Sequence, residues 1–347
     1  ASNLAVAPFQ VSSPKGRTSR CMALAVVKAP EKPSPTNGQQ RAKIVDEKDE
    51  EKLEIQFRDR LKSNRNSLGD THPDTLTVAN DLAMLLHDLG RLGEAEPLYR
   101  QVLDGCRNKL GDKHPYTLTS ANNLAGLLID LGKYKEAKTL FAEAHDGRCI
   151  CLGEGHLDTL QSANSLAQLL QTAGQLEQAE PLYRTVLEGR RSQLGDKHPQ
   201  TLTSASNLAG LLQARGRLDE AEPLDREALE GRRQMVGDVH PHTLQSANNL
   251  AGLLQARGRF EDAEPLYREA LEGRKKMLGE RHPHTLTSAN NLAGLLYAWG
   301  RFDDAETLFQ EALEGRRVKL GDRHVDTMQS VNNLGSLLQA RGRFEKA

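Results

Sequence analysis

A histidine with the same neighbours returns every 42 residues along most of this chain of 347 residues, and this period constrains the fold more than any other feature. Periods of about 20 to 50 residues are typical of solenoids and other repeat arrays, in which each unit packs only on its neighbours. The chain is therefore expected to be an array of seven units, numbered here 1 to 7 by the histidine that opens each one. These histidines are His72, His114, His156, His198, His240, His282 and His324.

Each unit is predicted to contain two helices. Proline follows the histidine in most units, and it is tolerated at the first helical position because its missing N–H would have no partner there. In unit 2, apolar residues at helical spacing predict a first helix over about 116–131, which Gly132 ends, and a second over about 134–152. Two antiparallel helices per unit predict an all-α fold, an α-α superhelix.

The repeats also divide the chain. Residues 72–347 are expected to form six full units and a truncated seventh, and residues 51–68, which match a second helix, to form a lone N-terminal capping helix. We expect the native polypeptide to continue, because the missing helix would leave apolar surface exposed. Residues 1–45 are expected to be a disordered tail with a linker, and their basic start has two interpretations, a transit peptide or a plain tail.

The sequence of unit 5 resembles a known repeat. Over residues 247–272 it contains Ala-Asn-Asn-Leu-Ala-Gly-Leu-Leu, then Gly-Arg, then Glu-Asp-Ala-Glu-Pro-Leu-Tyr-Arg-Glu-Ala-Leu-Glu. This pattern resembles the tetratricopeptide repeat (TPR). The period and the His-Pro-x-Thr-Leu opening are similar to the kinesin light chain and nephrocystin-3 class of that repeat. The resemblance covers about residues 51–347 and implies a solenoid of antiparallel helix pairs.

A row of amide side chains is predicted along the inner wall of this superhelix, on the face of each first helix opposite its apolar stripe. An amide can donate to a peptide carbonyl and accept from a peptide N–H, so the row suits an extended peptide. In the resembled family, asparagines of the inner wall bind cargo peptides. The candidate groove residues are Asn122, Asn123, Asn207, Asn248, Asn249, Gln255, Asn290, Asn291, Tyr297, Asn332 and Asn333.

The same asparagines have a second, compatible interpretation, in which they bridge neighbouring helices and hold the curvature. Asp81 and Ser165 interrupt the row. No lysine is predicted on this wall, so a ligand is expected to be neutral or mixed in charge. Glycines on the same face remove bulk and would let a ligand backbone come close. They are Gly126, Gly210, Gly252 and Gly294.

Three features of the second helices concern packing. Glycines such as Gly147 lie deep inside them, at a cost of up to roughly 1 kcal/mol relative to Ala, and are interpreted as close packing sites or slight bends. Basic residues near their ends, such as Arg232 and Arg274, are interpreted as solvated groups that complement the helix dipole. Asp225 replaces the aromatic residue of the other units, and an unpaired buried charge is unfavourable. We expect a local weak point there, unless Arg226 or another neighbour compensates.

Charge and composition bear on the class of function. The 46 basic and 47 acidic residues give a net charge of −1, so no net attraction to nucleic acid or anionic lipid is expected. The apolar runs are too short to span a membrane. Four cysteines are too few for a disulfide framework, which favours the cytoplasm, or a plastid if residues 1–21 are a transit peptide.

The repeated histidines argue against catalysis, because a catalytic constellation is needed only once whereas these recur at every helix start. They are interpreted as helix caps. The sequence contains no glycine-rich phosphate loop, no His-Glu-x-x-His and no Gly-x-Ser-x-Gly motif. We therefore expect no enzyme activity, no cofactor and no bound metal ion.

The predicted function is a scaffold that binds partner proteins through short peptide segments. The main alternative is a cargo adaptor of the kinesin light chain type, whose partner would be a kinesin heavy chain. Such proteins carry a long coiled coil before the repeats, whereas residues 1–50 show no sustained heptads, which argues against the heavy chain. Further alternatives are an RNA-binding helical repeat, disfavoured by the uniform uncharged wall, and the regulatory part of a larger enzyme.

Overall fold

The computed structural model describes residues 47–342, so the tail expected over residues 1–45 lies outside the described range. Over this range the chain forms fourteen helices and no strand, which confirms the predicted all-α superhelix. The first helix, α1, spans Glu47–Leu68 and includes the residues expected to form a capping helix. The units that follow are α2 (Pro73–Asp88) with α3 (Leu92–Leu110), α4 (Pro115–Asp130) with α5 (Tyr134–Leu152), α6 (Leu157–Thr172) with α7 (Leu176–Leu194), α8 (Pro199–Ala214) with α9 (Leu218–Val236), α10 (Pro241–Ala256) with α11 (Phe260–Leu278), α12 (Pro283–Ala298) with α13 (Phe302–Leu320), and α14 (Val325–Ala340).

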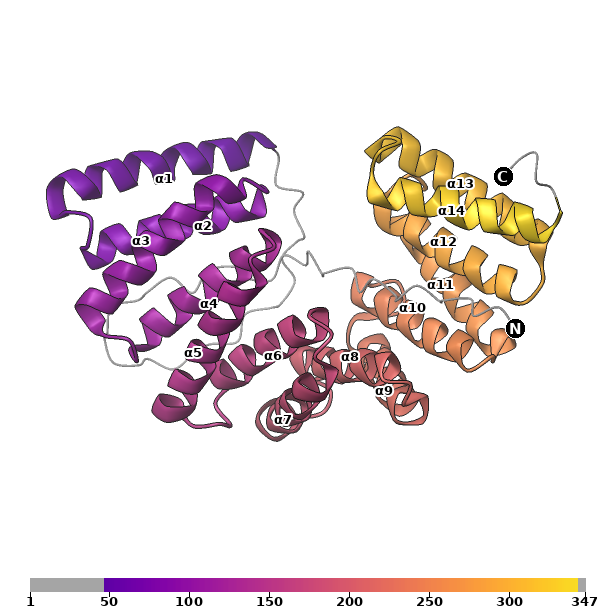
Figure 1. The fold of residues 1–347 in the computed structure, drawn as a ribbon, viewed down its shortest axis with the longest axis horizontal. Coiled ribbons are helices and arrows are strands. Elements are labelled where there is room, and N and C mark those ends of the chain that lie inside the picture. The colour runs from indigo at the N-terminus through magenta and orange to yellow at the C-terminus, as the bar shows by residue number, and fades with distance from the viewer. Residues whose placement is uncertain (1–46, 343–347) are drawn as a thin grey trace.

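The helix pairs stack in chain order and curve into an arc, with α1 at one end and α14 at the other (Figure 1). In the middle of the arc, the first helices α6 and α8 face its inside and the second helices α7 and α9 its outside (Figure 1). This arrangement follows from packing each helix pair on the next with a small constant rotation. The inner wall is therefore built from first helices.

Each first helix begins at the histidine of its unit. The backbone N–H of Tyr116 donates to Nδ1 of His114 over 3.2 Å, which satisfies one of the unpaired amides at the start of α4. His156 makes the same bond to Asp158 over 3.2 Å although leucine, not proline, follows it. The repeated histidines are helix caps, as the sequence predicts.

Glycine inside the second helices is required by packing within a unit. A Cβ atom added to Gly147 of α5 would lie 2.6 Å from Cδ2 of Leu118 on α4, which is closer than such atoms pack. The equivalent glycines of the other units meet the equivalent leucines in the same way. The close-packing interpretation is confirmed, because glycine is the residue that lets the two helices of a unit approach to this distance.

Two of the basic residues interpreted as solvated helix ends, Arg232 and Arg274, are instead buried, so that interpretation was wrong for them. Arg274 is 6% exposed and joins three helices. Its Nη1 donates to Ser288 Oγ over 2.8 Å on α12, and its Nη2 donates to Gln245 Oε1 over 2.7 Å on α10. Burial lowers the pKa of Arg274 to about 10, so the guanidinium stays charged near neutral pH. Equivalent buried arginines are Arg148, Arg190, Arg232 and Arg316.

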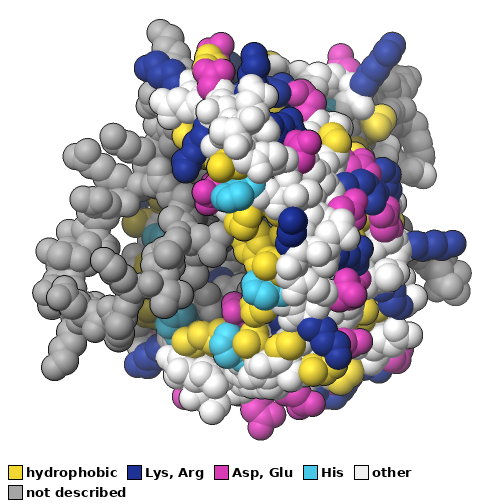
Figure 2. All heavy atoms as spheres, turned by 90° about the vertical axis from the view of Figure 1, so that its left-hand side faces the viewer, with side chains coloured by type: hydrophobic (Ala, Val, Ile, Leu, Met, Phe, Trp, Pro, Cys, Tyr) yellow, Lys and Arg dark blue, Asp and Glu magenta, His cyan; other side chains and the backbone are white. Residues whose placement is uncertain are grey.

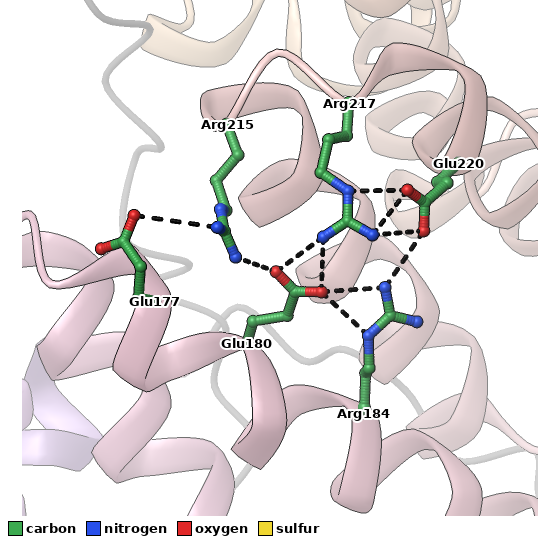
Figure 3. Close-up of polar contacts among 6 residues, drawn as sticks. All are labelled: Glu177, Glu180, Arg184, Arg215, Arg217 and Glu220. Carbon is green, nitrogen blue, oxygen red and sulfur yellow. Dashed lines mark hydrogen bonds and ion pairs between the residues drawn. The ribbon is translucent and has the colours of Figure 1, made fainter.

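A second contact between units lies at the edge where a first helix turns into a second helix (Figure 3). The carboxylate of Glu180 on α7 accepts hydrogen bonds from Arg184 on the same helix and from Arg215 and Arg217 in the turn after α8. Burial raises the pKa of Glu180, the hydrogen bonds from Arg184 and Arg217 lower it, and the net pKa is below its usual value. The same arrangement recurs around Glu222 with Arg257 and Arg259.

The opposite edge, where second helices turn into first helices, is more apolar. Figure 2 shows hydrophobic side chains and histidines in a broken column down this face. Leu68 at the end of α1 is 45% exposed, and Leu110 at the end of α3 is 42% exposed. On α14, Met328 is 49% exposed and Val331 is 41% exposed.

Candidate peptide-binding groove

The asparagines of the first helices form side-chain pairs between neighbouring units. In each pair the second asparagine of one unit donates from Nδ2 to Oδ1 of the first asparagine of the preceding unit. The bridging role that the sequence left open is therefore present. The pairs are Asn123 with Asn80 over 3.2 Å, Asn207 with Asn164 over 3.0 Å, Asn291 with Asn248 over 2.9 Å, and Asn333 with Asn290 over 3.0 Å.

Pairing uses only one of the two polar atoms of each amide. In the pair of Asn291 and Asn248, Oδ1 of Asn291 and Nδ2 of Asn248 make no hydrogen bond within the described residues. Both side chains are half-buried, so each retains some accessible surface. Each such pair presents one acceptor and one donor, the complement of one peptide N–H and one peptide C=O.

Two junctions lack an asparagine pair. Ser165 stands where unit 3 would have its second asparagine, and Oδ1 of Asn122 is consequently buried without a partner. Ser206 stands where unit 4 would have its first asparagine, and its Oγ is also buried without a partner. Asn249 therefore has no amide to donate to, and its Oδ1 accepts from Gln245 on the same helix over 2.7 Å.

Two of the remaining candidate residues, Gln255 and Tyr297, lie about two helical turns beyond the asparagines on the same face. Oε1 of Gln255 accepts from the hydroxyl of Tyr267 on α11 over 3.2 Å. The ring of Tyr297 lies 5.8 Å from that of Phe302 on α13, measured between centroids. Asn332 is exposed on α14. Gln255 and Tyr297 thus contact the second helix of their own unit, and Asn332 faces solvent.

Three of the four glycines predicted on this wall are open, whereas the fourth, Gly252, is buried. A Cβ atom added to Gly126, Gly210 or Gly294 would meet no atom within 4 Å. The glycines of the second helices are the opposite case, since a Cβ atom there would collide with leucine. Gly126, Gly210 and Gly294 are thus not required for helix packing, and they leave room beside the asparagines.

The wall becomes acidic toward α2 and α4. Asp81 occupies the second asparagine position of unit 1, and burial raises its pKa while Asn80 and Arg60 lower it, with a net increase. Oδ2 of Asp130 pairs with Nε2 of His87 over 2.7 Å across the two first helices. The amide row therefore belongs mainly to units 2 to 7.

Comparison with known protein families identifies the type of repeat in this chain. A tetratricopeptide repeat family model matches residues 61–108, 74–149, 151–234, 242–317 and 300–347, nearly the whole described chain. The chain belongs to the tetratricopeptide repeat family. This match confirms the resemblance of this TPR protein to the tetratricopeptide repeat, which its sequence motifs indicated.

Solved structures of similar proteins include TPR arrays with the same type of repeat. A kinesin light chain-like protein of Podosopora anserina with nearly identical TPR-like repeats is 28% identical, with a TM-score of 0.53 over 60% of this chain and 98% of that one. BtubC (BKLC) from P. vanneervenii is 28% identical, with a TM-score of 0.51 over 62% of this chain and 86% of that one. The apo quorum sensor NprR of B. thuringiensis is 15% identical, with a TM-score of 0.67 over 87% and 81%, and shares the fold alone. No curated protein matches the chain.

Some contacts between the units of this TPR protein escaped sequence reasoning. The arginine of a second helix and the serine 14 residues later recur with the period of the array, as in Arg274 and Ser288, and this recurrence was the available signal.

Of the predicted groove residues, Asn291 pairs with Asn248, and Asn333 with Asn290. Asn123 and Asn207 pair with Asn80 and Asn164, two residues that had not been selected. Among the helices of residues 47–342, none is long and apolar enough to cross a bilayer.

Proposed function

We propose that this TPR protein is a non-enzymatic scaffold that holds extended segments of partner proteins along the inner wall of its first helices. TPR arrays in general act as protein interaction modules, and their curvature creates extended concave surfaces. The observation that supports this role here is the set of asparagine pairs. Each pair, such as Asn291 with Asn248, keeps one acceptor and one donor without an internal partner.

The chemistry of the wall suggests the kind of segment. The amides of units 2 to 7 are uncharged, and a bound strand would use its backbone N–H and C=O groups there. The open positions at Gly126, Gly210 and Gly294 would admit that backbone. Toward unit 1 the wall carries Asp81, so the segment would be neutral over most of its length and could carry a positive charge at that end.

The test blocks the groove without touching the asparagine pairs. Gly210→Leu and Gly294→Leu place side chains in open space on α8 and α12. The matched control is Gly93→Leu on α3, where an added Cβ atom also meets nothing within 4 Å but the residue lies on a second helix. Peptides selected from a random display library on the native chain should lose affinity for the double variant at least tenfold and bind the control normally.

Circular dichroism must show unchanged helicity in both variants. Equal binding of the selected peptides to the native chain and to the groove variant would show that the peptides bind elsewhere, and the proposal would fail.

A second candidate is a cargo adaptor of the kinesin light chain type, favoured by the likeness to the Podosopora anserina protein. It would act through the same groove, with a kinesin heavy chain as an additional partner. Co-purification with a recombinant heavy-chain tail tests it directly. The proposed site of action is the cytoplasm, or a plastid if residues 1–21 direct import, and a fluorescent fusion of that segment separates the two.

A further inference from the structure

The junction between units 4 and 5 differs from the others in its core. At one position of the second helices, Asp225 replaces an aromatic residue, is 2% exposed, and has an Oδ1 atom without any hydrogen-bond partner. The hydroxyl of Tyr183 donates to Gln171 over 2.9 Å at the corresponding place in unit 3. The equivalent Gln213 on α8 makes no such bond. The aromatic residues at this position in other units are Tyr99, Phe141, Tyr183, Tyr267 and Phe309.

The apolar core is divided at this helix. Buried apolar side chains of the described chain form two clusters, one from Leu61 through Ala221 with Leu253, and the other from Leu229 onward. Asp225 lies on α9 between Ala221 and Leu229. Its carboxylate thus takes the place of the ring that connects the core of one unit to the core of the next.

The inner wall is interrupted at the same junction. Ser206 leaves Asn249 without an amide partner, so no asparagine pair joins α8 to α10. The junction between units 2 and 3 has also lost its asparagine pair, at Ser165, but it keeps the ring of Phe141, which is 3% exposed. The junction between units 4 and 5 therefore lacks both the aromatic ring and the asparagine pair.

The contacts that remain at this junction lie away from the inner wall. Arg232 donates to Ser246 Oγ over 2.5 Å and so ties α9 to α10. At the edge of the solenoid, Glu222 accepts hydrogen bonds from Arg257 over 2.7 Å and from Arg259 over 3.0 Å. These contacts can act as a pivot while the inner side separates.

We propose that the junction between units 4 and 5 is a hinge of the superhelix, and that it opens when Asp225 loses its proton. The protonated carboxyl is a small neutral group that the core tolerates. The carboxylate is a charge that is best relieved by admitting water, and the missing asparagine pair removes the restraint on the inner side. The hinge would change the curvature of the wall on both sides of it.

The electrostatic surroundings support this assignment. Burial raises the pKa of Asp225 to about 7, and the nearby Arg232 lowers it only in part. The buried side chains of α8 and α10 that pack against α9 include no titratable group. His240 and His242 lie near Arg232, and burial and that guanidinium lower the pKa of both, so they are neutral at pH 7. Arg226 does not compensate, because it pairs with Glu222.

Hydrogen exchange on the full chain tests the hinge locally. Amides of α9 and α10 are compared with those of α4 and α5 in the same sample, which cancels the intrinsic pH dependence of exchange. Between about pH 5 and pH 7 the opening constant of α9 and α10 should rise about tenfold per pH unit relative to the reference helices, and then level off. The direction follows because the open state, with a carboxyl pKa near 3.8, releases the proton that the closed state retains.

Two variants of Asp225 complete the test. Asp225→Asn keeps the size of the side chain and should abolish the relative pH dependence. Asp225→Tyr restores the residue of units 3 and 5 and should raise the protection of α9 and α10 toward that of the reference helices at every pH. The proposal is overturned if α9 and α10 show no relative pH dependence in the native chain, or if Asp225→Asn retains it.

Discussion

Asn207 of α8 donates a hydrogen bond from Nδ2 to Oδ1 of Asn164 on α6 over 3.0 Å, across 43 residues of sequence. The separation exceeds the 42-residue period by one, so the second asparagine of a unit meets the first asparagine of the preceding unit. Two consecutive asparagines are thus the minimum that allows a unit to pair with both of its neighbours. This relationship explains why the pair of asparagines recurs along the chain.

Restoring a missing pair should stabilise the array. Ser165→Asn supplies an amide to the unpartnered Oδ1 of Asn122, and we expect a gain of about 1 kcal/mol in the free energy of unfolding. Urea denaturation followed by circular dichroism measures it. In an Asn122→Ala background the same substitution should bring little gain, and an undiminished gain there would exclude the pair as the cause.

Removing a buried arginine should be costly. Arg274→Ala leaves Ser288 and Gln245 without their donor, and we expect a loss of about 3 kcal/mol. Thermal denaturation should show a much smaller change for Lys276→Ala, an exposed neighbour on the same helix. Similar losses for both residues would contradict the role of Arg274 in joining three helices.

Replacing glycine by alanine should have opposite effects on stability in the two helices of a unit. Gly147→Ala forces its Cβ against Leu118 and is expected to destabilise by about 1 to 3 kcal/mol. Gly126→Ala places the same atom in open space within a helix and should stabilise by up to about 1 kcal/mol. Chemical denaturation of the two single variants distinguishes them, and a shared sign would refute the packing argument.

The ion-pair network around Glu180 should stabilise the folded state mainly above acidic pH. The pKa of Glu180 is lowered in the folded chain, so its contribution to stability is present above the ordinary pKa of 4.5 and is lost as the pH falls through the folded pKa. Glu180→Gln should cost about 1 to 2 kcal/mol near pH 7 and nothing in strong acid. Glu177→Gln, at a side chain 76% exposed, is the matched control and should be nearly neutral.

Asp225 should make the free energy of unfolding depend on pH in the opposite direction. Its folded pKa of about 7 exceeds the ordinary pKa of 3.8, so the folded state binds more protons between these values and stability falls as the pH rises through that window. The total loss is about 4 kcal/mol. Denaturation midpoints of the native chain and of Asp225→Asn, measured from acid to neutral pH, should converge at low pH and diverge toward neutrality.

The period and the local motifs were enough to predict the helices. Unit 2 was expected to hold helices over about 116–131 and 134–152, and the structure has Pro115–Asp130 and Tyr134–Leu152. Helix starts and ends depend on contacts within a few residues, such as the cap from His114 to Tyr116, and these can be recognised in the sequence.

The candidate groove could be predicted only in outline. The asparagines could be assigned to one helix face by spacing, but the sequence alone could not show that Asn207 pairs with Asn164. That contact depends on the rotation between successive units, which sets the vertical offset of neighbouring helices. The role of these amides in binding a peptide stays a prediction.

What the sequence by itself determined is the repeating unit of this TPR protein: two helices, their caps, and the faces that are apolar. The tertiary structure alone decided what happens between units, including the burial of Arg274 among three helices and the division of the core at Asp225. The physical reason is the range of the interactions along the chain. Helix formation is governed by neighbours in sequence, whereas the energy of a buried charge depends on groups that come together only when the units stack.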